Sequence, residues 1–232
     1  MTRLRTEQIP FRLVTNTTSR SRALVVQRLA GYGFDVSAEE VFTATLAGVH
    51  VAKQAGYRVV APFVPEQALA DMADLELAGG TSGHPLKPVH AVLMGDLAEK
   101  WSYALLQEAF EYVMAGAALI ALSRDRYWLR DGKLALDAGP FVAGLEFAVG
   151  KQALVAGKPS PSFYTAALQS LDINSGKSVA MVGDDLWSDI QGAQQAGLKG
   201  WLVRTGKYQQ SALAESGIVP DRILESVATL RQ

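Results

Sequence analysis

Short apolar runs alternate with stretches of helical periodicity along this chain, and this alternation limits the available folds more than any other feature. In the stretch "SYALLQEAFEYVMAG", Tyr103, Leu106, Phe110 and Val113 fall on one face of a helix. Strands separated by helices form parallel sheets, because the helix returns the chain to the same edge. The sequence therefore predicts an α/β protein with mainly parallel strands. The apolar runs, each ending near Gly, Ser or Thr, are "VHAVLMG", "ALIALS", "QALVAG", "SVAMVG" and "GWLVRTG".

Composition excludes several classes of function. A net charge of −1 over 232 residues offers no basic surface for nucleic acid, so no nucleic-acid partner is expected. The absence of cysteine excludes disulfides, thiolate catalysis and cysteine-built zinc sites. No apolar run approaches the ~18 residues of a membrane span, and the N-terminus has no apolar signal region. We expect a soluble, cytoplasmic protein that does not bind membranes.

The first polar motif lies in "FRLVTNTTSR", where an apolar strand is followed by Thr15 and Asn16 and then by the start of a helix. Backbone N–H groups at such a junction, together with a hydroxyl and an amide, form a neutral cradle for an anion. The alternative is ordinary helix capping, since Thr, Asn and Ser favour the position before a helix.

The second motif is "VAGKPSPSFY", in which Lys158 follows a predicted strand. Ser160 and Pro161 then match the N-cap and first position of a helix. A lysine held between a strand end and a helix N-terminus can neutralise a phosphoryl group. The alternative is a solvated loop lysine, which is the usual environment of this residue.

The third motif is "VAMVGDDLWSDIQGAQQAG". A predicted buried strand, Val179–Val182, delivers Asp184 and Asp185 at its carboxyl end, and Asp189 follows on the first turn of a helix. Two converging carboxylates repel each other unless a hard cation lies between them, and Mg²⁺ prefers oxygen ligands. Asp184 and Asp189 are therefore candidate Mg²⁺ ligands, and Asp185 is a weaker candidate. The alternative is an acidic turn with an aspartate at a helix dipole.

Together these motifs resemble motifs II, III and IV of the haloacid dehalogenase (HAD) superfamily of phosphatases, in the order Thr15 and Asn16, Lys158, and "GDDLWSD". The long insertion between motifs II and III resembles the C2-type cap of class IIA. "GAALIALSRDRYW" and "LDAGPFVAGLEFAVGKQALVAGKPS" resemble the subgroup around phospholysine phosphohistidine inorganic pyrophosphate phosphatase. The resemblance implies a Rossmann-like HAD core formed by residues 1–45 and 150–232, with an inserted α/β cap domain at residues 46–149.

The family's mechanism implies roles for these residues. Phosphoryl transfer goes to an aspartate, and water then hydrolyses the aspartyl-phosphate. Mg²⁺ would be bound by Asp184 and Asp189, Lys158 would act in catalysis and bind the phosphoryl group, and Thr15 and Asn16 would hold its oxygens. The implied substrate is a small phosphorylated molecule or pyrophosphate. The resemblance also implies a homodimer formed through the cap.

One family feature has no match here. Motif I is a D-x-D sequence that supplies the nucleophile and the general acid/base, but residues 1–14 contain no aspartate. We expect a core that lacks its first strand, in a truncated or late-started chain, because the family's middle strand is costly to lose. The alternative is a catalytically inactive HAD-like protein that binds phosphate or a metabolite. A response-regulator or flavodoxin-like domain would explain the strands but not the insertion.

Overall fold

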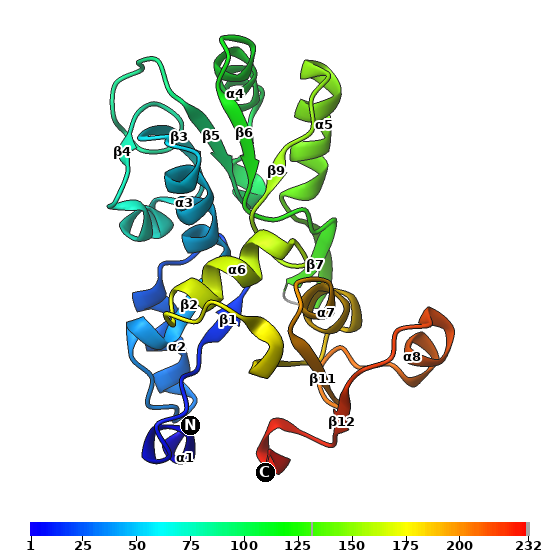
Figure 1. Cartoon of the computed structure of the whole chain (residues 1–232). Helices are drawn as coiled ribbons and strands as arrows, with labels where there is room; N and C mark the ends of the chain where they lie inside the picture. The colour runs from blue at the N-terminus through cyan, green and yellow to red at the C-terminus, as the bar shows by residue number, and fades with distance from the viewer. Residues whose placement is uncertain (131, 231–232) are drawn as a thin grey trace. The chain divides into compact units, whose positions relative to one another are not determined.

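The computed structural model describes residues 1–130 and 132–230. The chain divides into two compact units, which we call the N-terminal unit (Met1–Gly157) and the C-terminal unit (Lys158–Gln232). Strands and helices alternate in both (Figure 1).

The elements of the N-terminal unit are, in chain order, α1 (Thr2–Thr6), β1 (Leu13–Thr15), α2 (Arg22–Gly31), β2 (Val41–Thr43), α3 (Ala44–Gln54), β3 (Val59–Phe63), β4 (Glu76–Leu77), β5 (Ala91–Met94), α4 (Tyr103–Met114), β6 (Ala118–Ala121), β7 (Tyr127–Arg130), β8 (Lys133–Leu136), α5 (Gly139–Val149) and β9 (Leu154–Val155). Those of the C-terminal unit are α6 (Pro161–Gln169), β10 (Ala180–Gly183), a π-helix (Leu186–Gln191), α7 (Gly192–Gln195), β11 (Lys199–Val203), α8 (Gln210–Ser216) and β12 (Arg222–Leu224). Short 3-10 turns lie between some of them.

A five-stranded parallel sheet with the order β4-β3-β5-β6-β9 forms the centre of the N-terminal unit. Apolar side chains on one face of the sheet, including Phe63 and Met94, share a core cluster with Ala109 of α4 and Val142 of α5. Helix α3 covers the opposite face, where a Cβ on Gly48 would lie 2.1 Å from a methyl carbon of Leu122, so that the Leu122 side chain would have to shift. The sheet is therefore sandwiched between helices, which is the layering expected for parallel strands.

The predicted α/β class is confirmed. Among the described residues, the strand pairings are parallel except for the β7–β8 hairpin, and each apolar run named above overlaps a strand. Ser160 and Pro161 occupy the predicted N-cap and first position of α6. One expectation was wrong in degree: strand β10 is half-buried along its whole length, although the sequence predicts a buried strand at Val179–Val182.

The strands that precede the first and third polar motifs lie in separate small sheets, whereas β9, which precedes Lys158, belongs to the five-stranded sheet. β1 pairs with β2 in the N-terminal unit, with Thr15 opposite Thr43, and β10, β11 and β12 form a parallel sheet in the C-terminal unit. The predicted division into a core (1–45 and 150–232) and a cap (46–149) stays a prediction.

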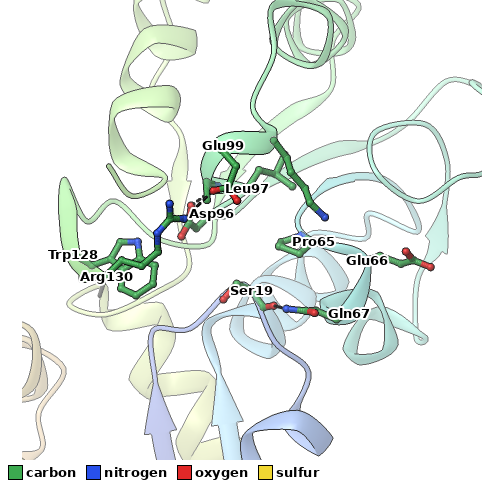
Figure 2. Close-up of a pocket in the computed structure, with 11 residues that line it drawn as sticks. Ser19, Pro65, Glu66, Gln67, Asp96, Leu97, Glu99, Trp128 and Arg130 are labelled. Carbon is green, nitrogen blue, oxygen red and sulfur yellow. Dashed lines mark hydrogen bonds and ion pairs between the residues drawn. The ribbon is translucent and has the colours of Figure 1, made fainter. Parts of the chain in front are cut away.

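A cavity of about 620 Å³ lies in the N-terminal unit where the loops after β3 and β5 meet strand β7 (Figure 2). Its lining includes Gln67 after β3, Asp96 after β5, and Trp128 on β7. Loops at the carboxyl ends of parallel strands are the usual ligand-binding positions of such sheets.

Among the described residues, no helix is long and apolar enough to cross a membrane.

Candidate functional site

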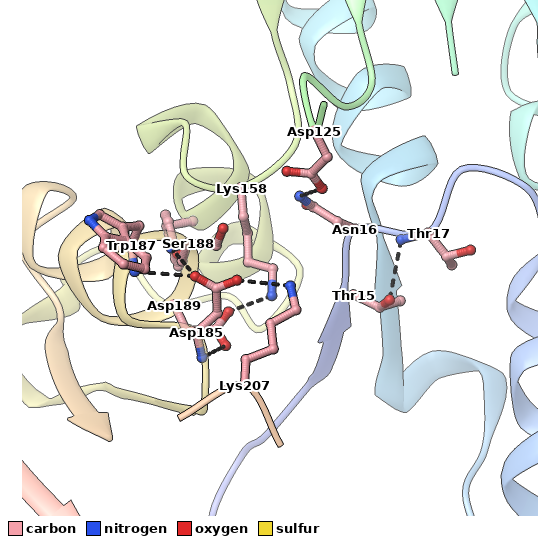
Figure 3. Close-up of polar contacts among 11 residues, drawn as sticks. Thr15, Asn16, Thr17, Asp125, Lys158, Asp185, Trp187, Ser188, Asp189 and Lys207 are labelled. Carbon is pink, nitrogen blue, oxygen red and sulfur yellow. Dashed lines mark hydrogen bonds and ion pairs between the residues drawn. The ribbon is translucent and has the colours of Figure 1, made fainter. Parts of the chain in front are cut away.

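The polar residues predicted from the sequence fall into two groups, and Figure 3 labels Thr15, Asn16, Lys158, Asp185 and Asp189 among them. Thr15 and Asn16 belong to the N-terminal unit, whereas Lys158, Asp184 and Asp189 belong to the C-terminal unit.

Thr15 and Asn16 lie in a turn at the carboxyl end of β1. The backbone N–H of Thr17 donates to Thr15 Oγ1 at 3.2 Å, which bends the chain directly after the strand. Helix α2 begins only at Arg22, with Ser21 as its N-cap. Helix capping therefore does not explain the polar residues at 15 and 16, and the turn remains a candidate anion cradle.

The side chain of Asn16 is held by a residue that the sequence did not single out. Asn16 Nδ2 donates to Asp125 Oδ2 at 3.2 Å, across 109 positions of the chain. Asp125 follows β6, so two strand ends of the same unit meet at this contact. The carboxylate orients the amide, and it is therefore a positioning residue for the turn.

Lys158 and Asp189 form a buried ion pair. Lys158 Nζ lies 2.6 Å from Asp189 Oδ1, and the two residues are only 9% and 5% exposed. The backbone N–H of Asp185 donates to the other Asp189 oxygen at 3.3 Å. These contacts exclude a solvated loop lysine, and they show that Asp189 is more than a surface aspartate at a helix dipole.

The neighbouring carboxylates have separate partners. Asp184 Oδ2 accepts the backbone N–H of Lys207 at 2.7 Å. Asp185 caps the π-helix by accepting N–H bonds from Trp187 and Ser188 at 3.2 and 2.9 Å. Its other oxygen lies 2.9 Å from Lys207 Nζ. Asp185 therefore has a structural explanation as a helix cap, which agrees with its weaker standing as a metal ligand.

Electrostatics follow from this packing. Burial on its own would raise the pKa of the Asp185 carboxyl, but the Lys207 hydrogen bond and the helix-capping N–H groups outweigh it and lower that pKa. Burial, with the negative charges of Asp189 and Asp185, raises the pKa of the Tyr164 hydroxyl. Tyr164 therefore stays protonated and donates to the carbonyl of Ser188, which anchors the segment between the two aspartates.

Two glycines make room for the carboxylates. A Cβ on Gly183 would lie 2.2 Å from Asp189 Oδ2, and a Cβ on Gly206 would lie 2.0 Å from Asp184 Oδ2. Gly206 also has a φ of +57°, a conformation that favours glycine. The backbone packs closely against carboxylate oxygens at both positions. This explains why glycine is found at Gly183, the end of β10, and at Gly206, in the loop after β11.

Replacing Gly183 by Ala is expected to displace the Asp189 carboxylate and to destabilise the protein by about 1–3 kcal/mol, the usual cost of overpacking. Urea unfolding would measure this. Gly144→Ala is the matched control, because the site in α5 has nothing within 4 Å of the new methyl group and should be neutral or slightly stabilised. Equal unfolding midpoints for Gly183→Ala and the wild type would contradict the tight packing around Asp189.

Comparison with known proteins places this arrangement in a family. A model described as haloacid dehalogenase-like hydrolase matches residues 1–78, and a HAD-hydrolase-like model matches residues 155–230. Haloacid dehalogenase-like hydrolase domain-containing protein 2 of Rattus norvegicus is 40% identical over 209 residues, covering 89% of this chain and 76% of that protein. Human (Homo sapiens) phospholysine phosphohistidine inorganic pyrophosphate phosphatase is 33% identical, covering 97% and 80%.

Solved structures show the same fold. A glycerol phosphate phosphatase from Mycobacterium tuberculosis, in complex with magnesium, matches with a TM-score of 0.82 and 29% identity over 96% of this chain and 67% of that one. A p-nitrophenyl phosphatase from Archaeoglobus fulgidus matches with a TM-score of 0.85 and 24% identity, covering 97% and 86%. The family models, the relatives and the shared fold agree: the chain belongs to the haloacid dehalogenase-like hydrolase family.

Proposed function

We propose that this chain carries the phosphate-binding and metal-binding parts of a Mg²⁺-dependent phosphatase, which hydrolyses a small phosphorylated substrate or pyrophosphate through an aspartyl-phosphate. The observation that supports this most is the buried pair of Lys158 and Asp189, 2.6 Å apart. Burying two charges costs desolvation energy that their attraction often fails to offset, so stability alone gives little reason for such a pair. A phosphatase site has a use for both charges: the cation neutralises the phosphoryl group and the carboxylate binds the metal.

Each residue has a role in this proposal. Lys158 neutralises the phosphoryl oxygens and lowers the repulsion between them and an attacking carboxylate. Within the N-terminal unit, Thr15 and the backbone at Asn16 would hold phosphoryl oxygens, and Asp125 fixes the Asn16 side chain. The homodimer formed through the cap stays a prediction.

The residues present fit Mg²⁺ in chemical type. Asp184, directly after β10, and Asp189, in the π-helix, offer carboxylate oxygens within the C-terminal unit. Mg²⁺ is commonly bound by one or two carboxylates with water and phosphate oxygens. Among the described residues, no three His, Asp or Glu side chains are grouped to hold a metal. The two aspartates would therefore bind the ion together with substrate and water. When bound, Mg²⁺ would offset negative charge on the transferred group.

By the family's pattern, the attacking aspartate would lie in a D-x-D sequence at the end of a strand. Residues 1–14 contain no aspartate, and Lys158 already pairs with Asp189. Strands β1 and β10 are half-buried at every residue, whereas every residue of β5 is buried. These observations support a proposal that a further strand, ending in D-x-D, completes the site. If no such strand exists, the runner-up function is an inactive phosphate- or metabolite-binding protein.

Mg²⁺ is expected to stabilise the folded protein by about 2.7 kcal/mol at a concentration about 100-fold above its Kd, because it binds the folded state only. Thermal unfolding with and without Mg²⁺ would measure this. Asp184→Asn should remove the effect while keeping the hydrogen bond from Lys207. Asp172→Asn, an exposed change in the same unit, should leave it intact. An unchanged Mg²⁺ effect in Asp184→Asn would place the metal elsewhere.

A further inference from the structure

The loop after β11 contacts an aspartate that is proposed to bind Mg²⁺. The backbone N–H of Lys207 donates to Asp184 Oδ2 at 2.7 Å, across 23 positions of the chain. A Cβ on the preceding Gly206 would lie 2.0 Å from the same oxygen. The backbone of this loop therefore holds one oxygen of the Asp184 carboxylate, and in the proposed metal site the other oxygen would bind the ion.

The side chain of Lys207 reaches the neighbouring carboxylate, as Figure 3 shows. Lys207 Nζ lies 2.9 Å from Asp185 Oδ2, with the lysine side chain 74% exposed and the aspartate side chain 18% exposed. Asp185 caps the π-helix that carries Asp189, and its backbone N–H donates to Asp189 Oδ2 at 3.3 Å. Lys207 thus contacts Asp184 through its backbone and the start of the π-helix through its side chain.

The loop that carries Lys207 is held in place by the core of the C-terminal unit. The next residue, Tyr208, packs against a buried apolar cluster. The cluster is formed by two residues of the π-helix and one of β11: Leu186, Ile190 and Leu202. The backbone N–H of Tyr208 also donates to the carbonyl of Thr205 at 3.1 Å, which closes a tight turn around Lys207. Packing therefore fixes the backbone of Lys207 relative to the π-helix, although its side chain is mostly exposed.

Charge alone gives no reason for a lysine at this place. An ammonium group repels a divalent cation, so a nearby lysine would weaken Mg²⁺ binding if it acted only through its charge. Mg²⁺ also requires near-ideal octahedral geometry, so its affinity depends on how closely the carboxylate oxygens match that geometry. Groups that hydrogen-bond the ligands of a metal supply this orientation. The contacts of Lys207 are of this second kind.

We propose that Lys207 is a positioning residue for the Mg²⁺ site. Its backbone orients the carboxylate of Asp184. Its ammonium group holds Asp185 and thereby the start of the π-helix that carries Asp189. Lys207 raises the affinity for Mg²⁺ in this way, although its charge alone would lower it. The inference rests on the function proposed above, in which Asp184 and Asp189 bind the ion.

Calorimetric titration of the 232-residue chain with Mg²⁺ alone tests this without turnover. Lys207→Met keeps the backbone N–H and removes the ammonium group. Its Kd for Mg²⁺ is expected to rise about 10-fold, at the low end of the effect of groups that orient metal ligands, because the side chain is mostly exposed. A lysine that acted only through its charge would give the opposite sign, a lower Kd in the variant. An unchanged or lower Kd would overturn the proposal.

Lys177→Met is the matched control, with the same change of charge in the same unit. Lys177 is exposed and lies before β10, at the opposite end of that strand from Asp184, so the Kd should stay close to that of the wild type. Because the lysine side of the ion pair is exposed, Lys207→Met should change the stability of the metal-free protein little, and the Kd then reports the metal site. Lys207→Gln is the second variant, with the same expected rise in Kd, if Lys207→Met does not fold.

A double-mutant cycle tests the route through Asp185. Asp185→Asn keeps an oxygen that can cap the π-helix but removes the ion pair with Lys207. Adding Lys207→Met to this variant should have little further effect on the Kd for Mg²⁺, because the pair is already broken. A rise of similar size with and without Asp185→Asn would contradict the assignment.

Asp184→Asn separates this inference from the proposed function. If the wild type binds Mg²⁺, Asp184→Asn does not, and Lys207→Met binds it as tightly as the wild type, the role of Lys207 is wrong and the metal site stands. If the wild type does not bind Mg²⁺, or Asp184→Asn binds it equally tightly, the proposed metal site is wrong and so is the role of Lys207.

Discussion

The 232-residue chain, supplied with Mg²⁺ and p-nitrophenyl phosphate, is expected to hydrolyse the ester no faster than background. With a strand ending in D-x-D added before Met1, turnover should rise by a factor on the order of 10⁴ to 10⁶, the usual effect of a catalytic nucleophile. The reason is chemical: in the proposed site, Lys158, Thr15 and Mg²⁺ would hold and neutralise a phosphoryl group, but none of them would form the aspartyl-phosphate. Release of p-nitrophenol measures both states.

The control is the same extended chain with the first added aspartate replaced by asparagine, which should return turnover to background. Lys158→Met in the active chain should also lower turnover steeply, because it removes charge stabilisation of the phosphoryl group. Rapid turnover by the unextended chain would show that the nucleophile lies among its own residues. No gain from the added strand would favour the inactive phosphate-binding protein.

Lys158→Met is also expected to destabilise the fold by about 3–5 kcal/mol, because it leaves the carboxylate of Asp189 buried without its cation. Lys158 Nζ and Asp189 Oδ1 are 2.6 Å apart, with side chains 10% and 7% exposed. The double variant Lys158→Met with Asp189→Leu should recover much of the loss, since apolar groups of similar volume replace buried ion pairs well. Urea unfolding of the four proteins gives the coupling energy.

An exposed ion pair provides the matched control. Lys53 Nζ and Asp74 Oδ2 are also 2.6 Å apart, but their side chains are 52% and 65% exposed. Water screens this pair, so Lys53→Met should cost less than about 1 kcal/mol. If Lys158→Met costs no more than Lys53→Met, the burial of the Lys158–Asp189 pair has no energetic consequence, and the argument from it fails.

The strand and helix positions were largely predictable, because they depend on local pattern. The run "SVAMVG" became β10, and the periodic stretch from Tyr103 became α4. Strand β3 was not singled out, although its residues are almost all buried. The half-burial of β10 was not predictable either, because burial depends on which elements pack against a strand, and local sequence does not specify them.

The site residues were predictable only where a motif carried them. Lys158 and Asp189 were both identified, yet their direct pairing was not, since it depends on how the segment before α6 meets the π-helix, 31 positions further along the chain. Asp125 was missed because its contact with Asn16 spans 109 positions and its own neighbours "SRDRYW" suggest a cap strand. The sequence offered one indication that Lys207 contacts the aspartates: it lies directly after Gly206, in the loop that follows strand β11.

The aspartyl-phosphate itself is the most direct test of the proposed function. The chain extended by a D-x-D strand, mixed with substrate and Mg²⁺ and quenched in acid, would be digested and examined by mass spectrometry. We expect one phosphoryl group on the first added aspartate, and its loss in the asparagine variant. Active enzyme with the phosphoryl group on a residue of the present chain, or with no phosphorylated residue during turnover, would contradict the proposal.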